Sequence, residues 1–557
     1  MSEPDVSNAE VAIIGGGPVG LVLALFLDLY GVRSILFNTE ATTRWHPKGS
    51  TESSRTMEHF RRLGIAQEIR KLGLPPDHPT DVAYFTRFGG YELARLPMPS
   101  ADEAARRRAT AAAIDQNPEP IHRANQMHVE RFLFDHGARR PNVTMRFGWQ
   151  VDDFSQDESG VTLRAAPQNG GAPEHWRANY VVGCDGGRSF VRHRLGIKFH
   201  GEAGLEQRYF GGRMFSTYVR APNLYRDFLG RRRAWQYWAV NPEIRSSLIA
   251  VNGVDEFLFR TQASVPGQPP EDAVVAEAMK RCVGAETKLE IVAHEPWTAG
   301  MALVAEHFGA DRVLLAGDAV HLFTPTGGFG MNTGIDDAAN LAWKLAALLQ
   351  GWGGQRLLES YELERKPIAI RNTNAARQLT VNIGETAVDP AIEQDSETGE
   401  TARRTAGKML AGFAEQFASI GVQLGARYDG SPLIAADGAP PADDFITYKP
   451  TSSPGGRAPH VWLGSKRDYG DSLYDHLSRG FTLLRIGPHA PHASVLAAAA
   501  VRCNIPFAVV DVPDSEARDF YQCDLALIRP DQYVAWRGNT VPTDSDALLA
   551  QLVGDYH

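Results

Sequence analysis

The chain has 557 residues, 43% hydrophobic and 22% charged, so it is an ordinary globular protein long enough for several hydrophobic cores. Its net charge of −9 offers no long-range attraction to nucleic acid or to an anionic membrane surface, and we expect neither as a partner. The four cysteines form no C-x-x-C pair, and the N-terminus lacks the basic and apolar regions of a signal peptide. We therefore expect a cytoplasmic protein with free thiols and no metal site.

The first forty residues predict a strand, a helix and a second strand, which is one βαβ unit. Gly15, Gly17 and Gly20 stand between the first strand and the helix in the spacing G-x-G-x-x-G. Glycine there permits a tight turn and lets a pyrophosphate approach the helix N-terminus. A residue at the end of the second strand of such a βαβ unit forms hydrogen bonds to the ribose hydroxyls. By its position we favour Asn38 for this role, with Glu40 as the alternative.

The rest of the chain alternates between strand-rich and helix-rich stretches. Aromatic and β-branched strands predominate from 205 to 295 and predict a separate antiparallel sheet, and helical patterns return after Gly317. Residues 391–450 are rich in Asp, Ala, Gly and Pro and predict a linker. Residues 451–557 have their own rhythm of strands and helices, which indicates a small α/β domain.

Three glycine-containing motifs occur in order along the chain. They are GGGPVG at 15–20, GCDGGRSFVR at 183–192, and GDAVH with PTGGFGMN at 317–332. Together they resemble the FAD-dependent aromatic hydroxylases, the single-component flavoprotein monooxygenases related to p-hydroxybenzoate hydroxylase. The match continues through RTMEHFRRLG, DDAANLAWKL and YELER, so it covers roughly residues 8–375. The trailing unit is similar to the thioredoxin-like C-terminal domain of the phenol hydroxylase and dichlorophenol hydroxylase branch, without its C-x-x-C.

The resemblance implies an α/β fold with a Rossmann-like FAD-binding domain, an interleaved antiparallel-sheet substrate domain and a thioredoxin-like C-terminal domain. The expected boundaries are 1–80, 110–200 and 295–390 for the FAD domain, 81–109 and 201–294 for the substrate domain, 391–450 for the linker, and 451–557 for the C-terminal domain. Without redox cysteines, the C-terminal domain is expected to have a structural or dimer-supporting role, so a homodimer is one expected assembly.

By the same resemblance, the first glycine cluster binds the ADP half of FAD. Arg55 and Gln126 would lie along the pyrophosphate and the ribityl chain. Asp185 belongs to a motif that these enzymes use near the pyrophosphate and for NAD(P)H, and Asp318 would bond a ribityl hydroxyl.

The second glycine cluster is expected to hold the flavin ring. Gly328 and Gly330 lack side chains, so the backbone can lie against the isoalloxazine. A helix beginning near Met331 and Asn332 would aim its N–H groups at the pyrimidine edge and stabilise the anionic reduced ring. By resemblance, the carbonyl of Pro325 contacts the substrate hydroxyl or the reaction intermediates.

The family reaction implies that NADPH or NADH reduces FAD and that O2 adds to form a flavin hydroperoxide. Its terminal hydroxyl is then transferred to an aromatic substrate, phenolic or polycyclic. Two alternatives remain open. The chain could be a Baeyer-Villiger or polyketide-tailoring oxygenase on the same scaffold, or a flavin-binding sensor without turnover.

The expected base for a phenolic substrate is missing. Relatives in the phenol branch carry Asp or His five residues before the Arg of RTxE, whereas this chain has Ser50, a poor base. We therefore predict a bulky or already electron-rich aromatic substrate. His46 and Glu52 are substitute bases, against the alternative of exposed loop residues, and Tyr237 is a third, against strand packing.

Two tryptophans, Trp235 and Trp297, are candidates to line an apolar substrate pocket, with core packing as the alternative. His321 of the GDAVH motif is expected to be packed or hydrogen-bonded rather than catalytic.

Overall fold

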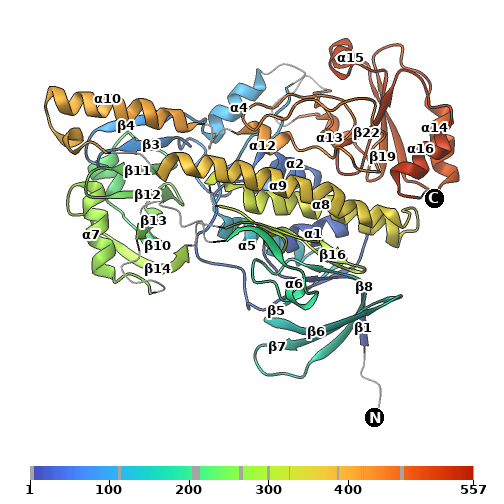
Figure 1. Cartoon of the computed structure of the whole chain (residues 1–557), viewed down its shortest axis with the longest axis horizontal. Helices are drawn as coiled ribbons and strands as arrows, with labels where there is room; N and C mark the ends of the chain where they lie inside the picture. The colour runs from blue at the N-terminus through green and yellow to red at the C-terminus, as the bar shows by residue number, and fades with distance from the viewer. Residues whose placement is uncertain are drawn as a thin grey trace.

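A computed structural model describes most of the chain (Figure 1). The described residues are 6–110, 115–203, 214–262, 268–297, 301–324, 326–384, 388–414, 417, 419–463 and 470–555. Within these ranges, no helix combines the length and the apolar character that a membrane crossing requires.

A parallel sheet forms the centre of the molecule. Its parallel strands, in spatial order, are β17 (Val313–Leu315), β8 (Glu174–Gly183), β1 (Val6–Ile14), β2 (Ser34–Asn38) and β5 (Val143–Phe147). The apolar run from Val11 to Ile14 is buried, as expected of a strand covered on both faces. The antiparallel strands β16 (Gly309–Ala310), β6 (Trp149–Asp157) and β7 (Gly160–Pro167) extend this sheet. The predicted βαβ unit is confirmed, with α1 (Pro18–Leu29) between β1 and β2.

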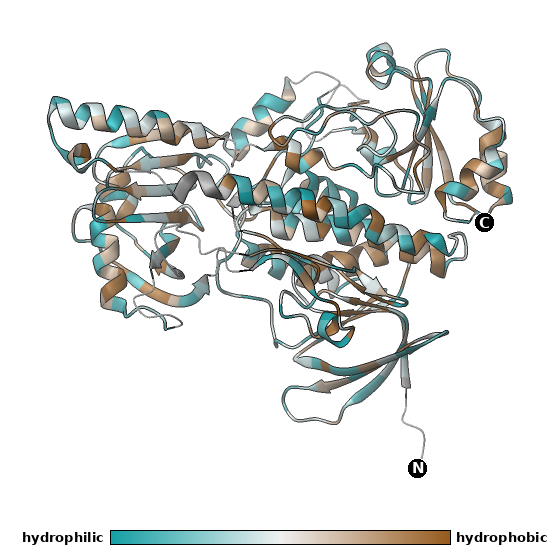
Figure 2. Ribbon diagram, in the orientation of Figure 1, coloured by the Kyte–Doolittle hydropathy of each residue, from teal (hydrophilic) through white to brown (hydrophobic). Residues whose placement is uncertain are grey.

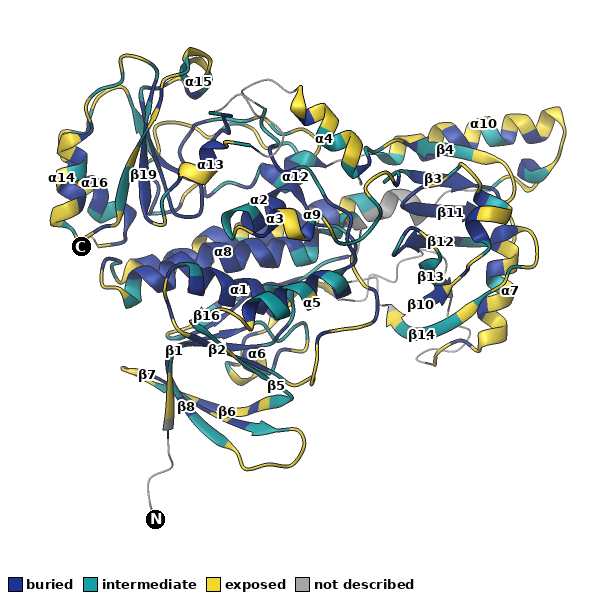
Figure 3. Ribbon diagram, turned by 180° about the vertical axis from the view of Figure 1, so that it is seen from behind, coloured by how far each residue is buried: buried dark blue, intermediate teal, exposed yellow. Residues whose placement is uncertain are grey.

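Two long helices cross the middle of the molecule side by side, α8 (Phe329–Leu349) and α9 (Arg356–Gly384) (Figure 1). α8 also packs against α1 and is buried from Asn332 to Ala347, which makes it dark blue along most of its length in Figure 3. Because α8 starts directly after the second glycine cluster, that cluster is anchored to the most buried helix of the protein.

A second sheet stands beside the first. Its order is β14 (Glu290–Trp297), β10 (Met214–Arg220), β13 (Glu256–Gln262), β12 (Arg245–Ala250), β11 (Gln236–Val240), β3 (Val82–Phe85) and β4 (Glu92–Leu96). All its pairs are antiparallel except β11 with β3, which is parallel because β3 arrives from an earlier segment rather than through a hairpin. One face packs under α7 (Asp272–Val283), and the other face turns toward the glycine cluster at the start of α8.

The C-terminal unit is a small α/β layer. Its sheet has the order β20 (Phe507–Val512), β19 (Phe481–Ile486), β21 (Leu525–Ile528) and β22 (Val534–Gly538), with β19 and β20 parallel. Its helices are α13 (Leu473–His476), α14 (Ser494–Arg502), α15 (Ser515–Tyr521) and α16 (Ser545–Leu552). All four cysteines of the chain are free.

The stretch that we expected to be a linker, 391–450, contains regular structure. It includes α10 (Glu397–Ala411) and α12 (Ile420–Leu424). α10 shows hydrophobic and hydrophilic residues in turn (Figure 2), and it buries Ala402, Ala406 and Leu410, at four-residue spacing, on the side that packs against β4. This segment therefore forms part of the structure around the second sheet.

The remaining elements are short connections between these layers. They are α2 (Ser54–Arg62), α3 (Ala66–Ile69), α4 (Ala101–Ala109), α5 (Gln126–Gly137), α6 (Phe190–Arg194), β9 (Phe199–Ala203), β15 (Met301–Ala305), β18 (His321–Leu322), and the single turns at Tyr225–Leu229, Gly317–Ala319, Thr326–Gly328, Pro390–Glu393 and Gly412–Ala414.

Candidate functional site

The first glycine cluster makes a turn that accepts no side chain at two positions. A Cβ on Gly15, whose φ is +114°, would lie 2.3 Å from the carbonyl oxygen of Cys184. A Cβ on Gly20 would lie 2.0 Å from the carbonyl oxygen of Gly15. The end of β1 and the start of α1 can approach this closely only because both residues are glycine.

Gly17 behaves differently, because a Cβ there would meet nothing within 4 Å. It is the N-cap of α1, and no side chain caps the helix. Pro18, the first residue of α1, has no N–H, so the N–H groups of Val19 and Gly20 are the first at this end, with no side-chain cap and with the positive end of the helix dipole behind them. This arrangement fits the pyrophosphate of a dinucleotide such as FAD.

Asn38 forms hydrogen bonds that stabilise the turn of the first glycine cluster. Its Oδ1 accepts a hydrogen bond from the Gly16 backbone N at 3.0 Å, and its Nδ2 donates to the Glu40 carbonyl at 3.1 Å. Glu40 is exposed beside it. Both residues lie at the end of β2, next to the glycine turn, and their roles at the ribose stay predictions.

Two acidic residues come together at the carboxyl edge of the central sheet. Gly183 pairs with Leu315, so the segments that leave β8 and β17 start side by side. Asp318 is exposed between buried Gly317 and Ala319.

Asp185 accepts a hydrogen bond from the Val191 N at 3.1 Å, while its Oδ1 is buried without a hydrogen-bond partner. Burial raises the pKa of Asp185. The edge therefore offers one exposed carboxylate and one unsatisfied acceptor beside the glycine turn, where open α/β sheets bind ligands.

The second glycine cluster turns sharply into α8. Gly327 and Gly328 have φ values of +81° and +69°, a region that other residues rarely adopt. A Cβ on Gly330 would make only ordinary contact, 3.5 Å from the Phe323 ring. α8 begins at Phe329, two residues earlier than predicted, and no side chain caps it, so its first N–H groups are available. Pro325 lies outside the described residues.

Asn332 ties the start of α8 to the start of α2. Its Oδ1 accepts from the Ser53 N at 2.8 Å and from the Thr56 hydroxyl at 2.6 Å. Its Nδ2 donates to the carbonyls of Thr51 at 2.9 Å and Gly328 at 2.6 Å. The side chain fixes the loop that is expected to lie against the flavin ring, and its neighbour in sequence, Met331, packs against the main core.

A pocket of about 860 Å³ of empty space, open to solvent, lies between this loop and the second sheet. It joins five distant stretches of the chain, 48–53, 121–123, 235–260, 327–329 and 417–423. They contribute Lys48, Gly49, Ser50, Thr51, Ser53, Ile121, Arg123, Trp235, Gln236, Trp238, Ile249, Arg260, Gly327, Gly328, Phe329, Phe417, Ser419 and Gln423. Two of the predicted substrate residues, Ser50 and Trp235, are therefore at this pocket.

The lining is basic and contains no carboxylate, imidazole or phenol group among its described residues. It contains Lys48, Arg123 and Arg260, and none of its described residues is an Asp, Glu, His or Tyr. The Ser50 hydroxyl accepts a hydrogen bond from the Asn125 Nδ2 at 3.2 Å. The pocket is thus electropositive, and no group in its described lining can act as a general base for a phenol.

Tyr237 is not at the pocket, although Gln236 and Trp238 are. Because side chains alternate along β11, Tyr237 points to the opposite face, where it packs with Phe88 and Tyr225. Its hydroxyl accepts from the Ala234 N at 2.6 Å, and burial raises its pKa well above the ordinary value. This placement fits the alternative that Tyr237 packs within the sheet, and it does not fit a role as the catalytic base.

The structure buries His46 and Glu52 instead of exposing them, and neither lines the pocket. The His46 ring packs edge-on against Tyr218 with Nδ1 2.9 Å from the Pro47 carbonyl, and burial lowers its pKa. Burial raises the pKa of Glu52 to about 8. Trp297 ends β14, and its side chain is outside the described residues.

Gln126 begins α5, and its Nε2 donates to Glu130 at 2.5 Å. It does not line the pocket, although its backbone N donates to the Gly49 carbonyl at 2.8 Å, one residue from Ser50. Its role along the ribityl chain stays a prediction.

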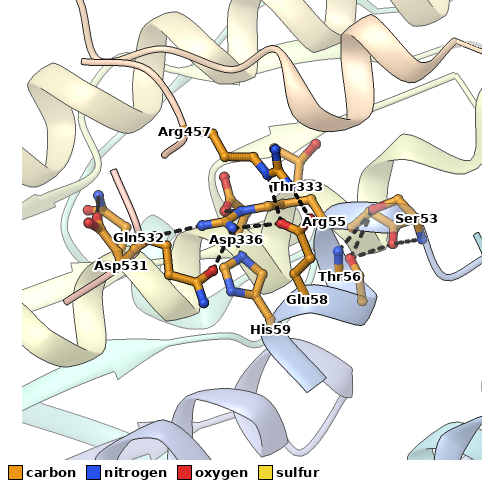
Figure 4. Close-up of polar contacts among 12 residues, drawn as sticks. Ser53, Arg55, Thr56, Glu58, His59, Thr333, Asp336, Arg457, Asp531 and Gln532 are labelled. Atoms are coloured by element: carbon orange, nitrogen blue, oxygen red, sulfur yellow. Dashed lines mark hydrogen bonds and ion pairs between the residues drawn. The ribbon is translucent and has the colours of Figure 1, made fainter. Parts of the chain in front are cut away.

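Arg55 lies in a buried polar cluster between α2, α8 and the C-terminal unit (Figure 4). Its Nη1 donates to Glu58 at 2.9 Å and to the Gln532 side chain at 2.7 Å, and its Nη2 donates to the Asp531 carbonyl at 2.7 Å. Its Nε is 3.6 Å from Asp336. These contacts are all with protein groups, so the structure shows Arg55 joining parts of the chain, and its predicted place along the pyrophosphate stays untested.

His321 is buried and hydrogen-bonded, as expected. Its Nε2 lies 2.7 Å from Asp337 Oδ2, the same oxygen that accepts from the Gly317 N at 3.1 Å. Arg365 of α9 donates to the other oxygen of Asp337 at 2.8 Å. These contacts connect the GDAVH motif to α8 and α9. They fix the position of the strand end next to Asp318.

Comparisons with known proteins agree with this geometry. A family model described as an FAD binding domain matches residues 8–376, and one described as aromatic-ring hydroxylase, C-terminal, matches residues 451–555. The FAD-dependent monooxygenase apdD of Emericella nidulans is 31% identical, over 100% of this chain and 92% of the relative. The tetracenomycin B2 monooxygenase-dioxygenase of Streptomyces olivaceus is also 31% identical, over 98% of each chain.

The solved structure of the rebeccamycin biosynthetic enzyme RebC with reduced flavin superimposes with a TM-score of 0.87 at 32% identity, covering 99% of this chain and 100% of that chain. The predicted fold, with its FAD-binding, sheet and C-terminal α/β parts, is confirmed, as is the prediction of an FAD cofactor. The chain belongs to the family of FAD-dependent aromatic-ring hydroxylases and is a flavoprotein monooxygenase that hydroxylates an aromatic substrate.

Proposed function

We propose that this monooxygenase acts on an aromatic compound larger than a simple monophenol, with NADPH or NADH as the reductant and O2 as the oxidant. The observation that carries the proposal is the pocket between the second glycine cluster and the second sheet, whose described lining contains aromatic side chains but no Asp, Glu, His or Tyr. Trp235 and Trp238 contribute two aromatic side chains to the pocket lining.

The chemistry of the lining supports an electron-rich substrate. When bound, reduced FAD would react with O2 so that one oxygen atom of the O2 is transferred to a ring carbon and the other leaves as water. Ring carbons accept an oxygen atom more readily as their electron density rises, and in a phenol a base usually provides that density by removing a proton. Since the described lining offers no such base, the substrate itself must bring the electron density.

The chain's own residues have three tasks in this proposal. The N–H groups at the start of α1 and the exposed Asp318 hold the cofactor. The start of α8, fixed by Asn332, aims its free N–H groups at the ring site. The sheet face with Trp235 and Trp238 forms one aromatic side of the pocket and shields the oxygen-transfer step from water on that side.

The names of relatives agree with a larger substrate. One relative is named for tetracenomycin B2, and the structure compared above is a rebeccamycin biosynthetic enzyme. A relative from Streptomyces halstedii, 32% identical to this chain, has a name that describes a polyketide hydroxylase, and we therefore favour a polyketide-tailoring role as the form of the hydroxylase activity.

The test is NAD(P)H consumption by the FAD-loaded protein with a panel of monophenols, polyphenols and fused-ring quinols, followed by mass spectrometry of the products. We expect the larger compounds to stimulate consumption and to gain one oxygen atom on an intact ring skeleton. Stimulation by monophenols alone would contradict the proposal, and a lactone product would favour the Baeyer-Villiger alternative. A cytoplasmic location and a homodimer stay predictions, and light scattering of the purified protein tests the homodimer.

A further inference from the structure

The pocket contains a buried arginine that sequence reasoning did not single out. Arg123 is 5% exposed, and its guanidinium carbon lies 3.8 Å from the centre of the Trp235 ring, a stacked cation–π arrangement. One Nη donates to the Thr51 hydroxyl, and the other is 3.8 Å from the Met98 sulfur. Both are weak partners for a full positive charge.

The acid whose charge acts on Arg123 is Glu52, and the two form no ion pair in the described part of the chain. No Asp or Glu oxygen there lies within 4.0 Å of the Arg123 guanidinium. The nearest acid in sequence to its Thr51 contact is Glu52, which is fully buried and accepts from the Ala124 N at 3.0 Å. Burial raises the pKa of Glu52 to about 8, so it is mostly protonated at neutral pH. Burial lowers the pKa of Arg123 to about 9, which leaves it charged there.

An uncompensated buried charge is costly, and a ligand anion at this position would remove the cost. Lys48 on the same lining adds to the positive potential, and none of the described lining residues is an Asp or a Glu. The residues of the first glycine cluster do not line this pocket, so the pyrophosphate of the cofactor belongs to a different part of the molecule.

We propose that the aromatic substrate carries a carboxylate and that Arg123, stacked on Trp235, binds it. This inference rests on the proposed function and specifies its substrate class. A carboxylate is favoured over a phenolate because it enters already ionised, whereas a phenol with a pKa near 10 needs a base that the described lining lacks. A planar guanidinium also matches a carboxylate well.

The experiment uses FAD-loaded protein and two probes of nearly equal shape, 1-hydroxy-2-naphthoate and 1-hydroxy-2-naphthamide. Binding is followed by the change in flavin absorbance. We expect the carboxylate to bind about tenfold to a hundredfold more tightly, the range for a hydrogen bond to a charged group. In Arg123→Gln this preference should vanish, and in Arg123→Lys part of it should remain.

The matched control is Arg131→Gln. Arg131 is an exposed arginine on α5, paired with Asp135 at 2.9 Å and away from the pocket lining, so the preference should persist. The FAD content of each variant reports whether it is folded. If Arg123→Gln is not folded, the Arg123→Lys variant and the two probes on the unaltered protein decide the question.

Equal affinity of the unaltered protein for the two probes would overturn the inference. So would an unchanged preference in Arg123→Gln, or a shifted flavin reduction potential in that variant with the probe preference intact, because the arginine would then serve the flavin. If neutral naphthols stimulate NAD(P)H consumption while the carboxylate brings no advantage, this inference fails and the proposed function stands. If no aromatic probe perturbs the flavin or stimulates consumption, the proposed function itself fails.

Discussion

Removing the charge of Glu58 should destabilise the protein more than any surface change. Glu58 is fully buried in the cluster of Figure 4, where it accepts from Arg55 at 2.9 Å and from the Arg457 Nε at 3.0 Å. Its other oxygen accepts from Arg457 Nη2. Glu58→Gln leaves two buried arginines with one anion fewer. Breaking a buried ion pair on one side costs about 3–5 kcal/mol, so we expect the free energy of unfolding to fall by that amount.

The pH dependence follows from the direction of the pKa shift. Burial alone would raise the pKa of Glu58, but Arg457 and Arg55 hold it below its ordinary value. The stabilisation from a lowered carboxyl pKa is complete above the unfolded value, about 4.3, and is lost as the pH falls through the folded value. The unaltered protein and Glu58→Gln should therefore differ most at neutral pH and converge in acid.

The assay is urea unfolding of the FAD-loaded protein at neutral pH, followed by circular dichroism. The control is Glu68→Gln, an exposed residue on the neighbouring α3, whose effect should stay within about 1 kcal/mol. Because Arg457 belongs to the segment that leads into the C-terminal unit, Glu58→Gln should also speed proteolytic release of that unit. Equal stability of the two variants would refute the reasoning.

Three further predictions concern the cofactor and the buried acid. Gly17→Leu should keep the fold, because a Cβ at this position meets nothing within 4 Å. It should lower the affinity for FAD at least about tenfold, because the leucine side chain fills the space for the pyrophosphate. Equilibrium dialysis measures the affinity, and an unchanged value would contradict this prediction. Asp318→Ala should weaken FAD retention on gel filtration, and full retention would remove its assigned role. Glu52 has a pKa raised to about 8, so the folded protein keeps a proton that the unfolded chain releases, and the free energy of unfolding should fall as the pH rises from about 4.3 to 8. In Glu52→Gln the midpoint of urea unfolding should depend less on pH. The same pH dependence in both proteins would contradict this prediction.

The cofactor-binding turns could be predicted from sequence because their chemistry is local. Gly20 and Gly328 are needed by backbone geometry within a few residues, and the strand and helix around them follow from short apolar patterns. Gly15 has a positive φ as well, but its close approach is to Cys184, which is distant in sequence. That His321 is packed and hydrogen-bonded could also be predicted from the sequence. Its partner Asp337 could not, because the two residues come into contact only when α8 packs beside the strand end.

The substrate pocket could be predicted only in part. Alternation along β11 separates Tyr237 from Trp238, but sequence does not say which face meets the cofactor loop. Phe417 and Gln423 come from a stretch that reads as a linker, and they line the pocket because that stretch folds back over the second sheet. Arg123 could have been suspected, since it stands three residues before Gln126, but its burial depends on the whole fold.

The central claim is that this chain is a flavin monooxygenase whose pocket takes a large aromatic substrate. The most direct measurement is mass spectrometry of products formed under labelled O2 by the FAD-loaded protein with NAD(P)H and a fused-ring quinol. We predict incorporation of one labelled oxygen atom into the ring, with consumption of one NAD(P)H per product. NAD(P)H consumption that produces only hydrogen peroxide across the fused-ring panel, together with oxygenation of monophenols, would contradict the account.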